Sequence, residues 1–367
     1  MTTQTAQSAR SAPAPAPRRG RVPLARFGPL VALVVLAVLP YCGLRLPGVF
    51  DSAVNAPGTL QLLALCLVFG ALAMGYDLLF GRTGMLSFGH ALYFAAGVYG
   101  TDMLVTKAGY GLWTAILLAV VGTAVLAALL GAIALRTGGI AFAMVTLAFA
   151  QVAAITIGRN PGGATGGEEG LPMDSSKVPD FLVGVANTVN LYWLALAALV
   201  VTVLVVHAIG DSPAGRVLAA IRDDERRVGV LGLDPYRYRL FAFTVAGGLA
   251  GLAGAMYALL IGGATPHIAA SDQTLTLLVM VVLGGPGTRW GPLIGGFLFT
   301  YLDYRLVALG DSDAVAGLPG VLRGPLSQPL FILGTVFILA VYFFPGGLAG
   351  LRTRLGPLAK WIPERRT

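Results

Sequence analysis

The chain has 367 residues, of which 56% are hydrophobic and 11% are charged, and its mean hydropathy is +0.79. Soluble domains carry about 25% charged residues, so the composition excludes an ordinary soluble protein and predicts one that crosses a membrane many times. The net charge of +8 gathers at the two ends of the chain, where it indicates the cytoplasmic side of a membrane and does not indicate a nucleic-acid partner.

The first segment, residues 1–27, is rich in Ala, Pro, Ser and Arg and has no apolar periodicity. We therefore expect a disordered, basic cytoplasmic tail. The apolar run Pro29–Pro40 that follows resembles the apolar core of a signal peptide. No small-residue cleavage site follows it closely, which favours a first span that is retained. Residues 28–348 are expected to form the membrane domain, and residues 349–367 a second basic cytoplasmic tail.

Apolar stretches long enough to cross or enter a membrane follow one another through this domain. The ten expected spans are about 28–44, 58–80, 86–106, 112–134, 140–158, 189–208, 240–262, 273–288, 291–308 and 329–346. A cytoplasmic start places Arg82, Arg136, the 211–239 loop and Arg289 inside, and makes 159–188 the longest outer loop. The predicted fold class is an all-α polytopic membrane protein with about ten transmembrane or re-entrant helices.

The number of spans leaves two architectures open. Ten spans divide into five and five, which allows two inverted five-helix halves, as in transporters built from inverted repeats. The span 273–288 is short and ends in Gly284-Gly285-Pro286-Gly287, so it is a candidate for a broken or re-entrant helix that other helices must cover. Eight spans with re-entrant pieces is the alternative.

Only one long stretch of the chain is dense in charge, the 211–239 loop between two apolar blocks. Ser212 can cap a helix that Pro213 begins, Gly232 offers a left-handed stop, and Pro235 prevents a simple continuation. Apolar residues recur on one face at helical spacing, at Val217, Leu218, Ile221, Val228 and Leu231. The pattern predicts a short amphipathic helix outside the membrane that another protein can grip.

Ionisable residues inside spans are costly and are often functional. The candidates are Asp77, His90, Asp102, His207 and Asp303. All except His90 lie near span ends, where interfacial water lowers the cost. His90 lies among Ser87, Phe88, Gly89 and Tyr93, a motif that disturbs helix regularity, so it is a candidate for the translocation path or for a packed, hydrogen-bonded histidine. Thr146 and Gln151 point to different faces of one span and can contact neighbouring helices or a passing zwitterion.

An enzymatic function finds no support in the sequence. The chain contains no Gly-Lys dipeptide, so it has no phosphate-binding loop of the G-x-x-x-x-G-K-[ST] type. Its two cysteines, Cys42 and Cys66, and its three scattered histidines form no metal-ligand or nucleophile pattern. We therefore expect no catalytic residue, no metal site and no cofactor.

Five stretches in order carry a family resemblance. They are Gly81–Ala91, Arg136–Gln151, Thr165–Leu171, Ala220–Gly232 and Val282–Pro292. Together they resemble the LivM-type permease of branched-chain amino acid ABC importers, over about residues 58–351. The chain departs from the family pattern at Met85, at Asp223-Asp224-Glu225, in the acidic pair Glu168-Glu169 and at Thr265-Pro266-His267, which leaves the substrate open.

The resemblance implies a multi-pass protein of the bacterial inner membrane with both termini cytoplasmic. It implies these partners: a second, LivH-like permease, two ABC ATPase subunits that hydrolyse the ATP, a periplasmic or surface-tethered binding protein, an amino acid substrate and membrane lipid. The 211–239 loop would correspond to the coupling helix. Its candidate ATPase-coupling residues are Arg222, Asp224, Glu225, Arg226 and Gly232. The candidate residues of the translocation path are Ser87, His90, Tyr93, Thr146 and Gln151.

Three alternative functions remain open. Related permeases carry urea or short amides. An ion- or proton-coupled secondary transporter would use Asp77 and His90 as a relay, and a passive channel is a further class. The charged 211–239 loop favours the ABC permease over the last two, because neither needs a helix that docks on an ATPase.

Overall fold

The computed structural model of the chain describes residues 28–43, 50, 52–310, 329–343 and 346–349. The expected tails, 1–27 and nearly all of 349–367, lie outside these described residues, as do residues 344–345 of the tenth expected span. The described part is an all-α bundle, as predicted, with one antiparallel pair of two-residue strands, β1 (Leu171–Pro172) and β2 (Gly263–Ala264).

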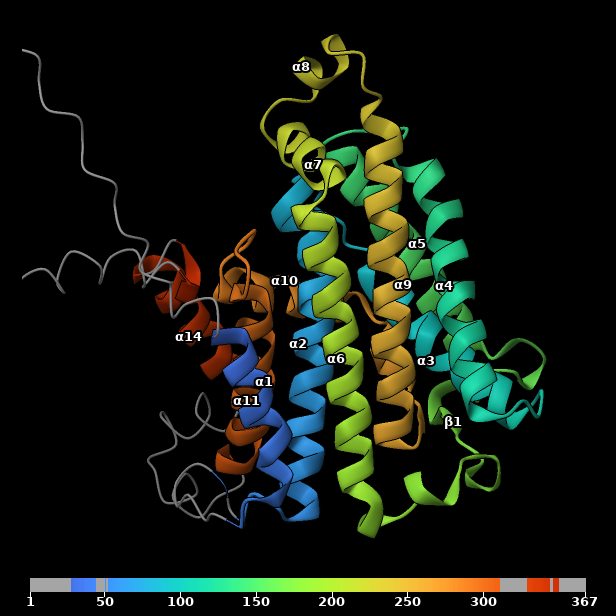
Figure 1. The fold of residues 1–367 in the computed structure, drawn as a ribbon. Coiled ribbons are helices and arrows are strands. Elements are labelled where there is room, and N and C mark those ends of the chain that lie inside the picture. The colour runs from blue at the N-terminus through green and yellow to red at the C-terminus, as the bar shows by residue number, and fades with distance from the viewer. Residues whose placement is uncertain (1–27, 44–49, 51, 311–328, 344–345, 350–367) are drawn as a thin grey trace, which may run out of the picture.

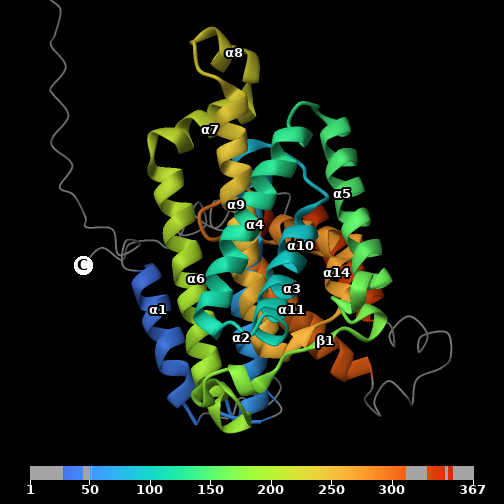
Figure 2. The same cartoon turned by 90° about the vertical axis from the view of Figure 1, so that its right-hand side faces the viewer.

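Each expected span contains one helix. They are α1 (Gly28–Val38), α2 (Pro57–Thr83), α3 (His90–Thr106), α4 (Leu112–Ala134), α5 (Ile140–Arg159), α6 (Thr188–Asp211), α9 (Pro235–Ile261), α10 (Ser271–Gly284), α11 (Gly291–Gly310) and α14 (Pro329–Phe343). By length and apolar composition, the segments of α2, α4, α5, α6 and α9 qualify as membrane-crossing helices among the described residues. The longer helices run side by side, with α7 (Pro213–Asp223) and α8 (Glu225–Val230) at one end of the bundle and β1 at the other (Figures 1 and 2).

The interior of the bundle is built around α2 and α9. Of the most apolar window in each helix, 89% is buried in α2 and 67% in α9, against 22% in α4 and in α5. α2 packs on α6, α9 and α11, whereas α9 packs on α3 and α4. Glycines allow the closest of these approaches, because a Cβ at Gly254 would collide with the Phe94 carbonyl and one at Gly97 with the Gly251 carbonyl.

Two segments that are not α-helical interrupt the bundle: residues 84–89 before α3, and residues 262–270 before α10, which hold β2 and a 3-10 turn. α3 has 17 residues and α10 has 14, which gives lengths of about 26 and 21 Å, short of the roughly 30 Å hydrocarbon core. The span expected at 273–288 is short, as its sequence indicated, and ends at Gly284; that it is broken or re-entrant stays a prediction. The expected helix start at residue 86 is wrong, because Gly84 adopts a left-handed φ of 71° that ends α2, and regular helix resumes only at His90.

The same order of elements occurs twice, in opposite directions. α2 runs toward the α7 end of the bundle and is followed by an irregular segment, the short α3 and the long α4. α9 runs away from that end and is followed by an irregular segment, the short α10 and the long α11. The packing is matched too, since α2 contacts α11 as α9 contacts α4, and each short helix contacts the long helix after it. This arrangement supports two inverted halves.

The 211–239 loop holds two short helices where the sequence predicted one. Ser212 caps α7 by accepting from the Gly215 N–H at 3.2 Å, as expected. The helix then breaks at Asp224, whose carboxylate accepts from the N–H groups of Arg226 and Arg227 and so begins α8. The prediction of a single helix is therefore wrong. Pro235, expected as a stop, is instead the first residue of α9.

Candidate functional site

The predicted coupling residues lie at the end of the bundle that carries α7 and α8. Arg222, near the end of α7, directs its guanidinium toward the membrane helices and donates a hydrogen bond to the Gly81 carbonyl of α2. Leu218 and Ile221 on the same helix are buried within this chain, so this part of the predicted apolar stripe packs inside the protein and is not free for a partner to grip. Arg222 therefore fastens α7 to the end of α2.

The remaining predicted coupling residues shape α8 and its junctions. Asp224 caps α8 and forms an ion pair with Arg227 at 2.9 Å. Glu225 forms an ion pair with Arg239 of α9 at 2.6 Å. Gly232 has a φ of 81° and ends the turn after α8.

The tip of the loop is apolar and uncovered. Val230, the last residue of α8, and Leu231, which follows it, are 89% and 77% exposed. Adjacent apolar side chains exposed in this way are typical of a surface that contacts another molecule. Arg226 lies on the same helix with an exposed side chain. The structure thus presents an apolar tip beside a basic residue at the end of the molecule farthest from β1 (Figure 1).

A cleft of about 440 Å³ separates α7 from the ends of the membrane helices. Its lining includes Arg82, His207, Asp211, Arg222 and Arg289. Ion pairing of Arg289 with Asp211 at 3.3 Å joins the loop before α11 to the end of α6. Movement of α7 would therefore displace α2, α6 and the loop before α11 together.

The loop before α11 is also held to α2. The carboxylate of Asp77, buried inside α2, accepts a hydrogen bond from the Gly287 backbone N–H at 2.7 Å. A second contact lies nearby, where the rings of His207 and Trp290 pack at an angle of 37° with centroids 4.8 Å apart. Two of the ionisable groups singled out in the sequence thus have structural partners.

Four of the five predicted path residues gather around the start of α3. Ser87, His90, Tyr93 and Thr146 are all buried, with at most 2% of their surface exposed. The His90 ring lies 5.0 Å from the ring of Tyr76 and 6.1 Å from that of Tyr93. The cluster is sealed by its neighbours, so the structure shows a closed core at this level of the membrane.

Side chains of α2, α5 and α10 hydrogen-bond the backbone of the irregular segment before α3 and of the first turn of α3. The Phe88 N–H donates to the Thr146 hydroxyl at 3.1 Å, and the Tyr76 hydroxyl donates to the Ser87 carbonyl at 2.9 Å. The Ala91 N–H donates to the Thr274 hydroxyl of α10 at 3.0 Å. These bonds are what permit non-helical backbone at membrane depth, and they bring the first turns of the two short helices together.

Gln151, the fifth predicted path residue, lies apart on the exposed face of α5. Its amide donates to the Ser271 hydroxyl, at the start of α10, at 2.8 Å. Apolar side chains surround it on that face, among them Ile140, Met144, Val152 and Ile155. Thr146 and Gln151 therefore contact two different segments, as their spacing predicted.

The outer loop 159–188 is fastened at the opposite end of the bundle by the β1–β2 pair. Within it, hydrogen bonds from the hydroxyl and backbone N–H of Ser176 hold the pKa of Asp174 below its usual value.

Among the described residues, no group of three His, Cys, Asp or Glu side chains could hold a metal ion. The polar contacts described in this subsection stabilise non-helical backbone and join neighbouring helices.

Sequence reasoning missed two features of this region. It assigned Arg222 to contact with a partner, whereas the guanidinium is bound to α2; the only signal was that Arg222 follows the buried Ile221. It gave Thr274 no role, although this hydroxyl joins α10 to α3. Nothing in the local pattern around Thr274 indicates a partner 183 positions away.

Comparison with known proteins identifies the relatives of this bundle. The family model described as "Branched-chain amino acid transport system / permease component" matches residues 58–341. The Escherichia coli high-affinity branched-chain amino acid transport system permease protein LivM is 28% identical over 316 residues, covering 77% of this chain and 70% of that protein. The autoinducer 2 import system permease protein LsrC of Yersinia enterocolitica is 32% identical over 174 residues, covering 44% and 46%.

Proposed function

The chain belongs to the permease family of branched-chain amino acid transport systems, and from that premise we propose that it moves branched-chain or similarly small amino acids into the cell by alternating access. It is a LivM-type permease subunit of an ABC importer and a multi-pass membrane protein. Its proposed partners are a second, LivH-like permease, two ATPase subunits and a substrate-binding protein. ATP would be hydrolysed in the ATPase subunits and not in this chain.

The observation that carries the proposal is the two-sided arrangement of the 211–239 loop. One side is bound to the membrane helices through Arg222, and the other presents the exposed tip of Val230 and Leu231. An ATPase groove that covers the tip would gain apolar contact, while Glu225 and Arg226 would orient it by charge. Asp224 and Gly232 would act by holding the shape of α8.

The translocation path is proposed to pass the junction of α3 and α10. Short helices preceded by unwound backbone mark substrate sites in other transporters with inverted repeats. Ser87, His90, Tyr93 and Thr146 are buried there, so a path past them requires the helices to separate during the cycle. Gln151 on the exposed face of α5 would meet the substrate or the second permease first.

The proposed orientation follows from charge. Placing α7 and α8 in the cytoplasm also puts Arg82, Arg136 and Arg289 at the cytoplasmic side. Both termini would then be cytoplasmic, and the 159–188 loop would face outward. Residues 28–348 would form the permease domain of a protein of the bacterial inner membrane.

The test of the coupling role reverses two charges. We expect the double variant Glu225→Arg, Arg226→Glu to insert and fold normally but to lose substrate-stimulated ATPase activity and leucine uptake in proteoliposomes of the full transporter. The matched control, Arg237→Glu, reverses one charge of a neighbouring exposed ion pair of 3.1 Å, leaves the Asp234 cap of α9 in place, and should retain uptake. Normal uptake in the first double variant would contradict the docking role.

The test of the ABC assignment is gentle purification followed by mass spectrometry of what co-elutes. A second permease and ATPase subunits are the expected companions. A chain that eluted alone, was stable and carried out gradient-driven uptake would favour a secondary transporter instead.

A further inference from the structure

The ionisable groups inside the membrane helices differ in whether the protein satisfies them. Asp77 accepts from the Gly287 N–H at 2.7 Å, and Asp102 accepts from the Thr106 hydroxyl at 2.9 Å. His207 bonds the Val203 carbonyl at 2.8 Å. Of the groups singled out in the sequence, His90 and Asp303 receive no hydrogen bond or ion pair from the described residues.

These two groups lie in opposite surroundings. His90 is fully buried between Tyr76 and Tyr93, where a neutral ring can serve as a packing group. Asp303 lies on α11, 12 residues after Gly291 and thus about 18 Å along the helix, and its side chain lines a cavity. A carboxylate at that depth is costly without a partner, and here it borders open space that a partner could fill.

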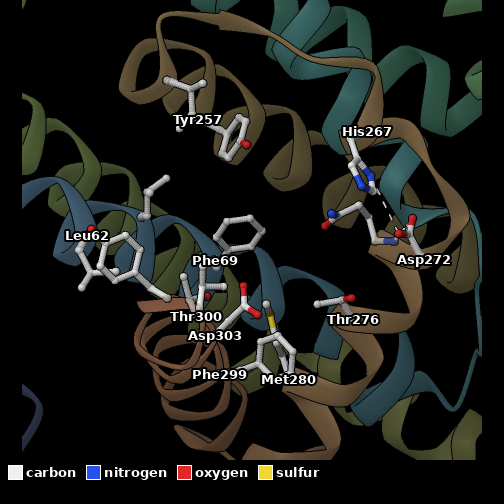
Figure 3. A pocket seen from close by; sticks show the side chains of 15 residues that line it. Leu62, Phe69, Tyr257, His267, Asp272, Thr276, Met280, Phe299, Thr300 and Asp303 are labelled. Carbon is white, nitrogen blue, oxygen red and sulfur yellow. Dashed lines mark hydrogen bonds and ion pairs between the residues drawn. The ribbon is translucent and has the colours of Figure 1, made fainter. Parts of the chain in front are cut away.

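The cavity has a volume of about 590 Å³ and lies between α2, α9, α10 and α11, within the roughly 300–1,000 Å³ typical of small-molecule sites. It occupies the end of the bundle opposite α7 and α8, near the start of α2 and the end of α9. Figure 3 shows the Asp303 carboxylate directed into it, with Phe69, Tyr257 and Phe299 around it. The Phe69 and Tyr257 rings pack edge to face with centroids 6.0 Å apart.

The lining carries negative charge and aromatic faces. Asp272, at the start of α10, contributes a second carboxylate, whose oxygen lies 4.0 Å from His267. Among the described residues, no Lys or Arg lines the cavity. Aromatic faces attract cations, and a nearby positive charge stabilises a partly buried carboxylate such as that of Asp303. The combination selects an organic cation and disfavours an anion.

We propose that this cavity is a binding site for the primary ammonium group of a small amphipathic amine, with Asp303 as the charge partner and the aromatic rings as the wall for its apolar part. That this amine is the transported amino acid rests on the proposed function. The site would then meet the substrate before the α3–α10 junction does, at the outer end of the path. Thr276 and Thr300, also on the lining, are placed to contact the polar end.

The experiment separates the two ends of leucine. The full-length chain, with the subunits that co-purify, is placed in nanodiscs of phosphatidylglycerol and titrated calorimetrically with 3-methylbutylamine, which lacks the carboxylate, and with 4-methylpentanoate, which lacks the ammonium. We expect the amine to bind and the acid not to. Asp303→Asn should weaken amine binding about 10-fold or more, whereas Asp303→Glu should keep most of it. Asp180→Asn, an exposed acid outside the cavity, is the matched control and should bind as wild type.

Several outcomes would overturn the assignment. Equal amine binding by wild type and Asp303→Asn would do so, and so would equal binding of the acid. If Asp303→Asn does not fold, Thr300→Phe fills the cavity and leaves the carboxylate, and undiminished binding by that variant would be equally decisive. Loss of amine binding on adding phosphatidylethanolamine to the nanodisc would assign the cavity to a lipid headgroup, against a soluble amine.

Leucine uptake by the complete transporter is measured separately. Binding that depends on Asp303 without leucine uptake would uphold the site and refute the proposed cargo. Leucine uptake by wild type without amine binding would uphold the cargo and refute the site.

Discussion

The hydroxyl of Thr274 offers a direct measure of what holds the irregular backbone before α3 in place. It is fully buried and accepts the Ala91 N–H at 3.0 Å. The substitution Thr274→Val keeps the side-chain shape and leaves that N–H without a partner. A buried donor left unsatisfied costs about 1–3 kcal/mol, while hydrogen bonds between membrane helices average about 0.6 and reach about 1.7 kcal/mol. We therefore expect the variant to lose about 1–2 kcal/mol of unfolding free energy.

Thr202 in α6 provides the control. It is equally buried, but its hydroxyl donates to the Ala198 carbonyl one turn earlier at 3.0 Å, an acceptor that the helix backbone already satisfies. Thr202→Val should therefore cost less than about 0.5 kcal/mol. Both variants are measured by denaturant titration in mixed micelles, followed by tryptophan fluorescence. Equal losses in the two variants would refute the claim that Thr274 stabilises the break between α2 and α3.

Three further expectations concern other parts of the fold. Arg222→Ala should cut leucine uptake about 10-fold while ATP hydrolysis persists, because α7 loses its bond to α2, and parallel uptake and ATPase assays that fell together would contradict this. Gly254→Ala should lower unfolding free energy by about 1–3 kcal/mol through overpacking, whereas Gly229→Ala, with open space around it, should be neutral or stabilising in the same denaturant titration. Hydrogen bonds from Ser176 lower the pKa of Asp174 in the folded protein. These bonds therefore order the outer loop fully at pH values above the unfolded-state pKa of about 3.9, and the order is lost as the pH falls through the lower folded-state pKa. Amide exchange at Ser176 should therefore lose protection only in that acidic window, and protection unchanged there, or lost near neutral pH, would refute it.

The membrane helices could be predicted from the sequence because each follows a local rule. Runs of about 20 apolar residues have few alternatives to a membrane helix, so a helix lies in each of the ten predicted segments, and five of the described helices are long and apolar enough to cross a membrane. The loop helix α7 was predicted from Ser212 and Pro213, and Ser212 does cap it.

The remaining features depend on pairings that no local pattern encodes. Asp224 reads equally well as one more charge on a helical face or as the cap of a new helix, and the structure shows the cap. The start of α3 depends on Thr146 and Thr274, which lie 58 and 183 positions from the N–H groups that they accept. Asp303 was judged to be an interfacial residue from its distance to a span end, whereas only the packing of four helices reveals the cavity beside it.

The brevity of α10 has a consequence for how the protein is made. With 14 residues it falls below the roughly 20 that the insertion machinery needs to stabilise a segment on its own. The segment before it, residues 262–270, is not α-helical, and its strand β2 pairs with β1 of the outer loop, so this backbone needs another part of the protein to satisfy it. The Thr274 hydroxyl of α10 accepts a hydrogen bond from a backbone N–H of α3. The glycines of α11 pack against α2 and α10. The start of α3 in the first half depends in turn on Thr274 of the second half, so the backbone contacts of the two halves are complete only when both halves are in the bilayer.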